Sequence, residues 1–201
     1  MDYTQLGRTG LKVSRLVLGT MNFGPETSET DSHAIMDSAH DAGINFFDTA
    51  NVYGRDHKGR TEEIVGSWFA RGGGRRDKTV LATKVYGSMT GSGWPNEDRL
   101  SALNIRRAAE ASLKRLGTDH IDLYQFHHID RATPWEEIWQ AVDVLIQQGK
   151  ILYAGSSNFP GWAIAQGNEI AGRRGSLGLI SEQCIYNLIE RRAEMEVIPA
   201  A

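Results

Sequence analysis

Four polar side chains that could act on one substrate lie at or soon after short apolar runs of this 201-residue chain. They are a carboxylate, a phenol, an ammonium and an imidazole, supplied by Asp48, Tyr53, Lys84 and His127. The carboxyl ends of parallel strands lie together at one end of a barrel, so these groups are expected to converge there. This set suits delivery of a proton to a carbonyl oxygen while a hydride reaches the carbonyl carbon.

Each of these side chains has an expected role in such a reaction. Tyr53 is the proton donor, but a free phenol is a weak acid at neutral pH. An adjacent ammonium from Lys84 would make the phenol a better donor, because a nearby cation stabilises the phenolate. Asp48 would keep Lys84 charged and aimed, and His127 would donate a hydrogen bond to the carbonyl oxygen.

Simpler explanations exist for the same residues. Taken singly, they could be a turn cap, an exposed loop cation, a ring packed in a surface loop and half of a polar histidine pair. A metal site of His127, His128 and Asp130 is a further alternative. It is disfavoured because adjacent residues on a strand point to opposite faces, and no metal is expected.

Extended and helical patterns alternate along the chain after an N-terminal hairpin over Tyr3–Leu6 and Leu11–Val13. The predicted strands are Leu16–Leu18, Ile44–Phe47, Thr79–Thr83, Ile121–Phe126, Ile151–Ala154 and Leu179–Gln183. The predicted helices are Asp31–His40, Thr61–Phe69, Arg99–Leu116, Trp135–Gln148 and Trp162–Ala171, with the start of another over Glu190–Ile198.

Repeated strand–helix units of this length imply parallel strands, in either a doubly wound sheet or a (β/α)8 barrel. The segment Gly19–Gly24 after the first strand lacks the G-x-G-x-x-G pattern of dinucleotide-binding folds, which favours the barrel. A closed barrel takes eight strands and about 250 residues. We therefore expect one domain over residues 1–201, with about six of the eight units and truncated at its C-terminus. Its open strand edges favour pairing with another chain, so a homo-oligomer is one alternative.

Composition limits the kinds of binding partner and the cellular compartment that are expected. The net charge is −3 and the basic residues are scattered as pairs, which argues against nucleic-acid binding. A single cysteine, Cys184, excludes an intrachain disulfide and indicates a reducing compartment. No apolar run approaches the roughly 20 residues that cross a bilayer, and no signal peptide is evident. We expect a cytoplasmic protein without membrane insertion.

Several ordered motifs resemble the aldo-keto reductase superfamily. They are Phe47–Gly54, Thr83–Lys84, Leu123–His127 and Gly155–Phe159. The segments Gly7–Ser14 and Leu18–Gly24 are similar to the bacterial branch akin to potassium-channel β subunits. Together the motifs extend across essentially the whole chain.

The resemblance implies a (β/α)8 barrel plugged by the N-terminal hairpin, and NADPH-dependent reduction of aldehydes and ketones. It implies the same roles for the four residues above. It adds partners for the nicotinamide carboxamide, namely Ser157, Asn158 and Gln183, since amides and hydroxyls both donate and accept hydrogen bonds. For Gln183 the alternative is a strand residue bonded to backbone. Residues expected to approach cofactor or substrate are Gly19, Thr20 and Met21.

The chain departs from the family pattern after Ala201, where relatives continue into two further units. Those units carry the aromatic residue that stacks on the nicotinamide and the basic loop for the cofactor phosphates. The favoured hypothesis is a small-molecule carbonyl reductase. The alternatives are a non-catalytic, partner-binding protein like a channel β subunit, or an inactive fragment of a reductase.

Overall fold

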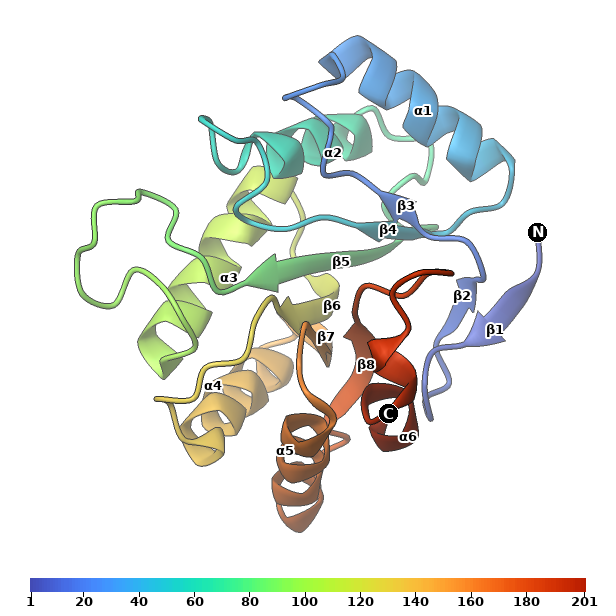
Figure 1. Ribbon diagram of the computed structural model, residues 1–201. Helices are drawn as coiled ribbons and strands as arrows, with labels where there is room; N and C mark the ends of the chain where they lie inside the picture. Colours follow the sequence, from blue (N-terminus) through green and yellow to red (C-terminus); the bar gives the residue numbers. More distant parts are fainter.

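Six parallel strands form one curled sheet in the computed structural model, which describes residues 1–201 (Figure 1). They are hydrogen-bonded in chain order, β3-β4-β5-β6-β7-β8. Their bounds are Leu18–Gly19 (β3), Phe46–Asp48 (β4), Val80–Val85 (β5), Ile121–Phe126 (β6), Ile151–Ser157 (β7) and Leu179–Gln183 (β8). The strands β3 and β8 are not paired with each other, so the sheet is a partial (β/α) barrel. The predicted fold class is confirmed.

Helices cover the outer side of this sheet. Figure 1 shows them in an arc from α1 to α5, and the side that the arc leaves open holds the hairpin and the C-terminal segment. Their bounds are Glu29–Asp41 (α1), Arg60–Ala70 (α2), Ala102–Leu116 (α3), Trp135–Gln147 (α4), Gly161–Arg173 (α5) and Val197–Ala200 (α6). None of these helices is both long enough and apolar enough to cross a bilayer.

Several predicted elements differ from the observed ones in their bounds; β4 ends at Asp48 and not at Phe47, and β7 ends at Ser157 and not at Ala154. The first strand begins at Leu18, because Leu16 and Val17 are exposed ahead of it. The strand predicted to end at Thr83 continues to Val85, so Lys84 lies within β5 and not after it. The segment predicted to start a helix at Glu190 instead forms a short 3-10 turn, η1 (Arg192–Glu194), followed by α6.

Side chains alternate between the two faces of the sheet. The outer face is apolar, and the inner face is apolar at one level and polar at the next. Outward side chains such as Phe47 and Phe126 join the main core against the helices, together with Trp68 and Trp139. The inner face begins with a small apolar cluster of Val13, Phe46, Ala82 and Leu123. The polar residues of the site occupy the next inward-facing positions of the same strands, two residues further along the chain.

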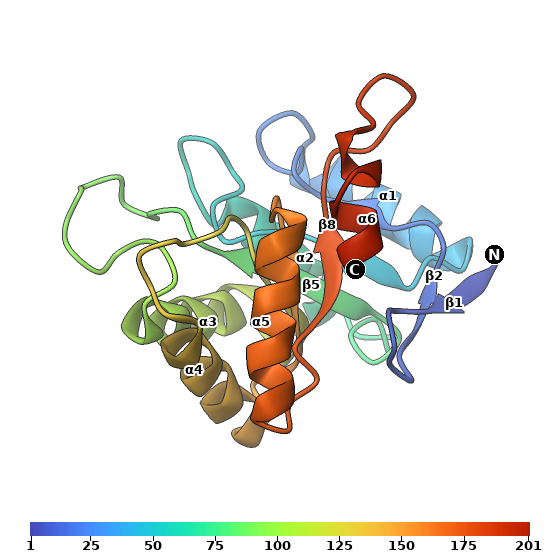
Figure 2. The same ribbon diagram turned by 60° about the horizontal axis from the view of Figure 1, so that its bottom comes forward.

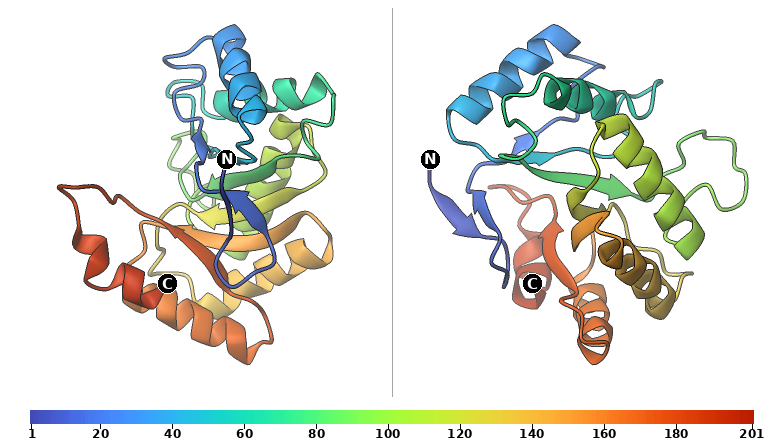
Figure 3. Two further views of the ribbon diagram at one scale, coloured as in Figure 1. Left: turned by 90° about the vertical axis from the view of Figure 1, so that its right-hand side faces the viewer. Right: turned by 180° about the vertical axis from the view of Figure 1, so that it is seen from behind.

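The N-terminal hairpin closes one end of the curled sheet, as its resemblance to a barrel plug implied. Its strands are β1 (Tyr3–Gln5) and β2 (Lys12–Ser14), which pair antiparallel. Figure 3 shows the hairpin at one end of the sheet. The turn approaches β8 so closely that a Cβ on Gly7 would lie 2.3 Å from the Ile180 carbonyl oxygen.

A buried ionic network fixes β5 against its covering helices. The Glu62 carboxylate, fully buried on α2, accepts hydrogen bonds from Arg115 Nε on α3 (2.7 Å) and from Thr83 Oγ1 (2.6 Å). A buried carboxylate is tolerated when a cation and further donors satisfy it. Thr83 immediately precedes Lys84, so this network holds the strand that carries the lysine.

The segment after β8 stands away from the sheet as a loop (Figure 2). Its apolar side chains Leu188 and Ile189 are 95% and 96% exposed.

Close packing of α2 on α3 supplies a test of this arrangement. A Cβ on Gly66 would lie 2.5 Å from the Arg115 carbonyl oxygen and 2.8 Å from the Leu116 carbonyl carbon, both backbone atoms that cannot move aside easily. We expect Gly66→Ala to lower the free energy of unfolding by about 1–3 kcal/mol, as overpacking does. Urea denaturation followed by circular dichroism measures the change.

The matched control is Gly172→Ala near the end of α5, where a new Cβ would meet no atom within 4 Å. There the substitution should stabilise by up to about 1 kcal/mol, because alanine has the higher helix propensity. Equal effects at the two positions would contradict the proposed steric contact.

Candidate active site

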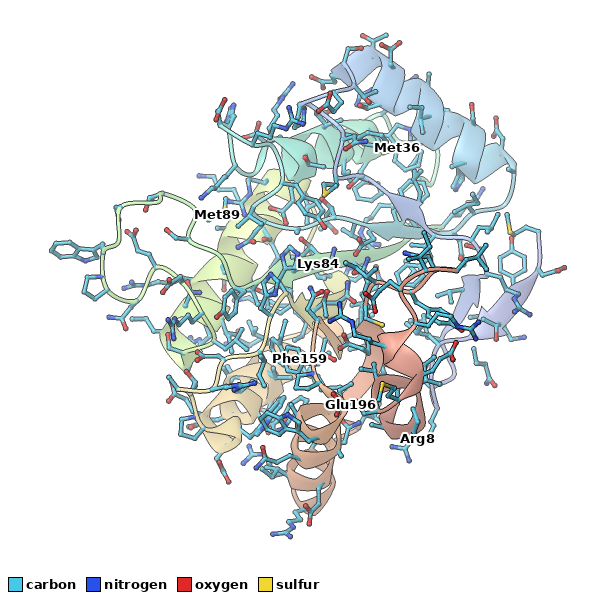
Figure 4. All side chains as sticks on the ribbon, viewed as in Figure 1. Arg8, Met36, Lys84, Met89, Phe159 and Glu196 are labelled. Carbon is cyan, nitrogen blue, oxygen red and sulfur yellow. The ribbon has the colours of Figure 1, made fainter.

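Neighbouring strands bring the predicted carboxylate and ammonium together. Asp48 is the last residue of β4 and pairs in register with Ala82 of β5. Lys84 lies two residues beyond Ala82, so its side chain points to the same inner face. Figure 4 shows Lys84 near the middle of the molecule.

Lys84 and Asp48 form a buried, bidentate ion pair. Lys84 Nζ lies 2.7 Å from Asp48 Oδ1 and 2.7 Å from Oδ2. The two side chains are only 1% and 9% exposed. The ammonium also donates to the Thr49 carbonyl oxygen at 2.9 Å. Burial of two charges is costly unless such further hydrogen bonds satisfy them.

Tyr53 brings its hydroxyl to the same ammonium. Its Oη lies 3.2 Å from Lys84 Nζ, and the ammonium is 5.0 Å from the centre of the phenol ring. The loop between β4 and α2 turns back here because Gly54 has φ 122°, a conformation that favours glycine. A Cβ on Gly54 would lie 2.2 Å from the His57 carbonyl oxygen, so the turn requires glycine.

His127 follows the last residue of β6 and packs against the phenol. The two rings meet edge to face with centres 5.8 Å apart. Burial, reinforced by the charges of Lys84 and then His128, lowers the pKa of His127 from 6.5 to about 4. At neutral pH the imidazole is therefore uncharged and has one N–H to donate.

The structure thus brings the four predicted catalytic residues into one cluster. Strand alternation predicted opposite faces for His127 and His128, and this prediction was wrong: their rings stack 5.1 Å apart, 6° from parallel. They follow Phe126, where β6 ends, so strand alternation no longer applies. No group of three or more His, Cys, Asp or Glu side chains is arranged to hold a metal ion.

Two glutamines complete the surroundings of Asp48. Gln125 Nε2 donates to Asp48 Oδ1 at 3.1 Å, and Gln183 Nε2 donates to Oδ2 at 3.2 Å. The sequence predicts a site role for Gln183 but not for Gln125. Strand periodicity could have found it, because Gln125 lies two residues before His127 and pairs in register with Lys84.

The residues expected to contact a nicotinamide lie beside His127, at the ends of β7 and β8. Asn158 Nδ2 donates to the His127 carbonyl oxygen and to Ser157 Oγ, both at 3.0 Å. Ser157 Oγ in turn donates to the Gln183 carbonyl oxygen at 2.9 Å. Asn158 has φ 58°, a left-handed conformation that asparagine tolerates better than most residues. The Gln183 side chain itself turns toward Asp48.

The three residues at the end of β3 that were expected near cofactor or substrate differ in their exposure. Thr20 is 1% exposed, and its hydroxyl donates to the Asp48 carbonyl oxygen at 2.9 Å. Gly19 and Met21 are exposed at the unpaired edge of the sheet. Thr20 therefore supports the end of β4, and only its two neighbours are free to meet a ligand.

A cavity of about 380 Å³ lies beside this cluster. Its polar wall includes Asp48, Gln125 and Gln183, and its apolar wall includes Phe46 and Leu123. The cavity borders the buried carboxylate, whereas Lys84, Tyr53 and His127 are not among its lining residues.

Known proteins are similar to this chain over nearly all of its residues. Residues 15–201 match the model of the aldo/keto reductase family. The whole chain is 58% identical to the "Uncharacterized oxidoreductase YrpG" of Bacillus subtilis and covers 63% of that protein. Over 99% of the chain, identity is 36% to the versiconal hemiacetal acetate reductase of Aspergillus parasiticus, with 63% of it covered.

A probable voltage-gated potassium channel subunit beta from rice is 37% identical over 99% of the chain, with 60% of its own length covered. The chain therefore spans less than two thirds of the curated relatives that it matches. The family match extends over nearly all of its residues. The chain belongs to the aldo/keto reductase family.

Proposed function

We propose that this protein reduces aldehydes or ketones to alcohols with NADPH, and that Tyr53 donates the proton. The observation that carries the proposal is the contact of the Tyr53 hydroxyl with Lys84 Nζ at 3.2 Å, on an ammonium fixed by Asp48. Membership of the aldo/keto reductase family supports an oxidoreductase that acts on carbonyl groups.

The proton transfer follows from the charges at the cluster. As the carbonyl carbon accepts a hydride, negative charge develops on the carbonyl oxygen. The Tyr53 O–H bond breaks, the proton joins that oxygen, and the phenolate left behind faces the Lys84 ammonium. Asp48 balances the lysine charge before the substrate arrives. Solvent then returns a proton to Tyr53.

His127 orients the carbonyl in this scheme. Because the imidazole is neutral above about pH 5, its N–H donates a hydrogen bond without competing as an acid. Its edge-to-face contact with Tyr53 supports a substrate oxygen bound between the two side chains.

NADPH supplies the hydride when it is bound. Ser157 and Asn158 fit the nicotinamide end of such a cofactor, because the Asn158 amide nitrogen is engaged by protein atoms and its side-chain carbonyl is left for an outside donor. Gly19 and Met21 would flank the ligand. The preference for NADPH, a cytoplasmic location and self-association through the open edges are parts of the same proposal.

Tyr53→Phe tests the proton donor. Removal of one hydroxyl preserves the ring packing against His127, so folding should be retained. We expect carbonyl reduction to fall by at least about a hundredfold, in line with the loss of a general acid. Tyr3→Phe is the matched control, since its exposed hydroxyl bonds the distant Gly43 carbonyl oxygen. A fully active Tyr53→Phe variant would exclude Tyr53 as the acid.

The charge state of His127 can be measured directly. We expect its imidazole to take up a proton only as the pH falls through about 4, because burial and Lys84 both disfavour the cation. Proton NMR of the histidine ring signals reports the midpoint, and His127→Gln identifies the resonance. A midpoint above 7 would mean that a cation, not a neutral donor, faces the carbonyl at neutral pH.

Cofactor binding is tested on the 201-residue chain by titration with NADPH, followed by cofactor fluorescence. We expect saturable binding that Asn158→Ala weakens by about tenfold, the effect of one lost hydrogen bond in a site. Asn96→Ala is the matched control, because Asn96 is an exposed asparagine with a similar left-handed φ of 67°. Absence of binding would mean that these 201 residues do not hold the cofactor by themselves.

A further inference from the structure

The Asp48 carboxylate accepts more hydrogen bonds than the ion pair alone requires. Each oxygen receives one from Lys84 Nζ and one from a glutamine amide, Gln125 at Oδ1 and Gln183 at Oδ2. The two amides approach from β6 and β8, while the ammonium comes from β5. A carboxylate with donors from three strands has little freedom to rotate about its Cβ–Cγ bond.

The two glutamines are not equivalent. Gln125 is 3% exposed on β6, a strand paired on both sides, whereas Gln183 is exposed at the end of the edge strand β8. Gln125 Nε2 also lies 3.5 Å from Gln183 Oε1, at the limit of a hydrogen bond. Gln125 is therefore the more firmly held of the two amides.

The backbone of β7 leaves room for this amide to reach across. Gly155 pairs in register with Gln125 and occupies the inner-face position between β6 and β8. A Cβ on Gly155 would lie 2.5 Å from Ser181 Oγ and 3.3 Å from Gln125 Cγ. Glycine at this position therefore clears the space that the glutamine side chain and Ser181 fill.

We propose that Gln125 is a positioning residue, whose amide fixes the Asp48 carboxylate and, through it, the Lys84 ammonium against Tyr53. The inference rests on the proposed function for its catalytic consequence, but the effect on Lys84 does not depend on turnover. Without the amide, Asp48 Oδ1 loses one of its two donors. The carboxylate then gains freedom to rotate, and the ammonium loses its fixed distance from the Tyr53 hydroxyl.

Two variants separate the amide from the space that it fills. Gln125→Met keeps a long unbranched side chain and removes both polar atoms. Gln125→Asn keeps the amide but shortens the side chain by one carbon–carbon bond, about 1.5 Å, so the amide no longer reaches Asp48. Gln147→Met, at an exposed position of α4, is the matched control for the first change. Circular dichroism verifies that each variant folds.

Hydrogen exchange of the Lys84 ammonium with water is the readout that needs no substrate. Nitrogen–proton NMR detects a lysine ammonium only when hydrogen bonds slow its exchange, and Lys84→Met assigns the signal. We expect exchange to be about tenfold faster in both Gln125 variants, or the signal to be lost, and to be unchanged in Gln147→Met. Carbonyl reduction should show a kcat reduced by about tenfold or more with an unaltered KM for NADPH.

The outcomes distinguish this inference from the proposed reaction. Unchanged ammonium exchange in the Gln125 variants would overturn the positioning role, whatever the activity. Faster exchange with unchanged kcat, in a protein that Tyr53→Phe inactivates, would overturn the link from Gln125 to catalysis. If the unsubstituted chain shows no turnover at all, the proposed function fails, while faster exchange would still support the positioning of Lys84.

Discussion

The ion pair between Lys84 and Asp48 is the interaction on which the rest of the site depends. Two charges with almost no solvent contact demand further hydrogen bonds in place of those that water would make. The Thr49 carbonyl oxygen, the Tyr53 hydroxyl and the two glutamine amides meet that demand. The demand also explains why the inner face of the sheet changes from apolar to polar at this level.

Curvature of the sheet makes this convergence possible. Gln183 on β8 and Asp48 on β4 are hydrogen-bonded, although β5, β6 and β7 lie between their strands in the sheet. A flat sheet would hold those residues roughly 19 Å apart, at about 4.8 Å for each neighbouring strand. The contact is therefore a direct measure of how far the six strands have curled toward closure. Six strands are therefore sufficient to bring the polar side chains of β4 and β8 into contact.

Sequence patterns predicted the order and type of nearly all elements, because strands and helices alternate with distinct periodicities and glycine or serine residues mark many helix ends. They also located the four side chains of the cluster, since each lies at or near a strand end. Contacts between side chains of different strands were not predicted. Gln125 is an ordinary polar residue in an otherwise apolar strand, and only the approach of Asp48 from another strand gives its amide a partner.

The same limit applies to His127, His128 and Gln183, whose surroundings differed from expectation. The stacking of His127 and His128 depends on where β6 ends, and the period-two rule cannot foresee that point. The turn of Gln183 toward Asp48 depends on sheet curvature, which no local pattern encodes. The boundary of β5 depended on pairing as well, because Lys84 is a strand residue only through its partner Gln125 on β6.

The two faces of β5 couple the helical layer to the polar centre. Thr83 points outward to the buried carboxylate of Glu62, and Lys84, the next residue, points inward to Asp48. Displacement of this strand segment would disturb both contacts together. Local opening of the protein is therefore expected to involve α2, α3 and β5 as one cooperative unit, of the kind that protects amide hydrogens together. A displacement of the covering helices would therefore also move the Lys84 ammonium.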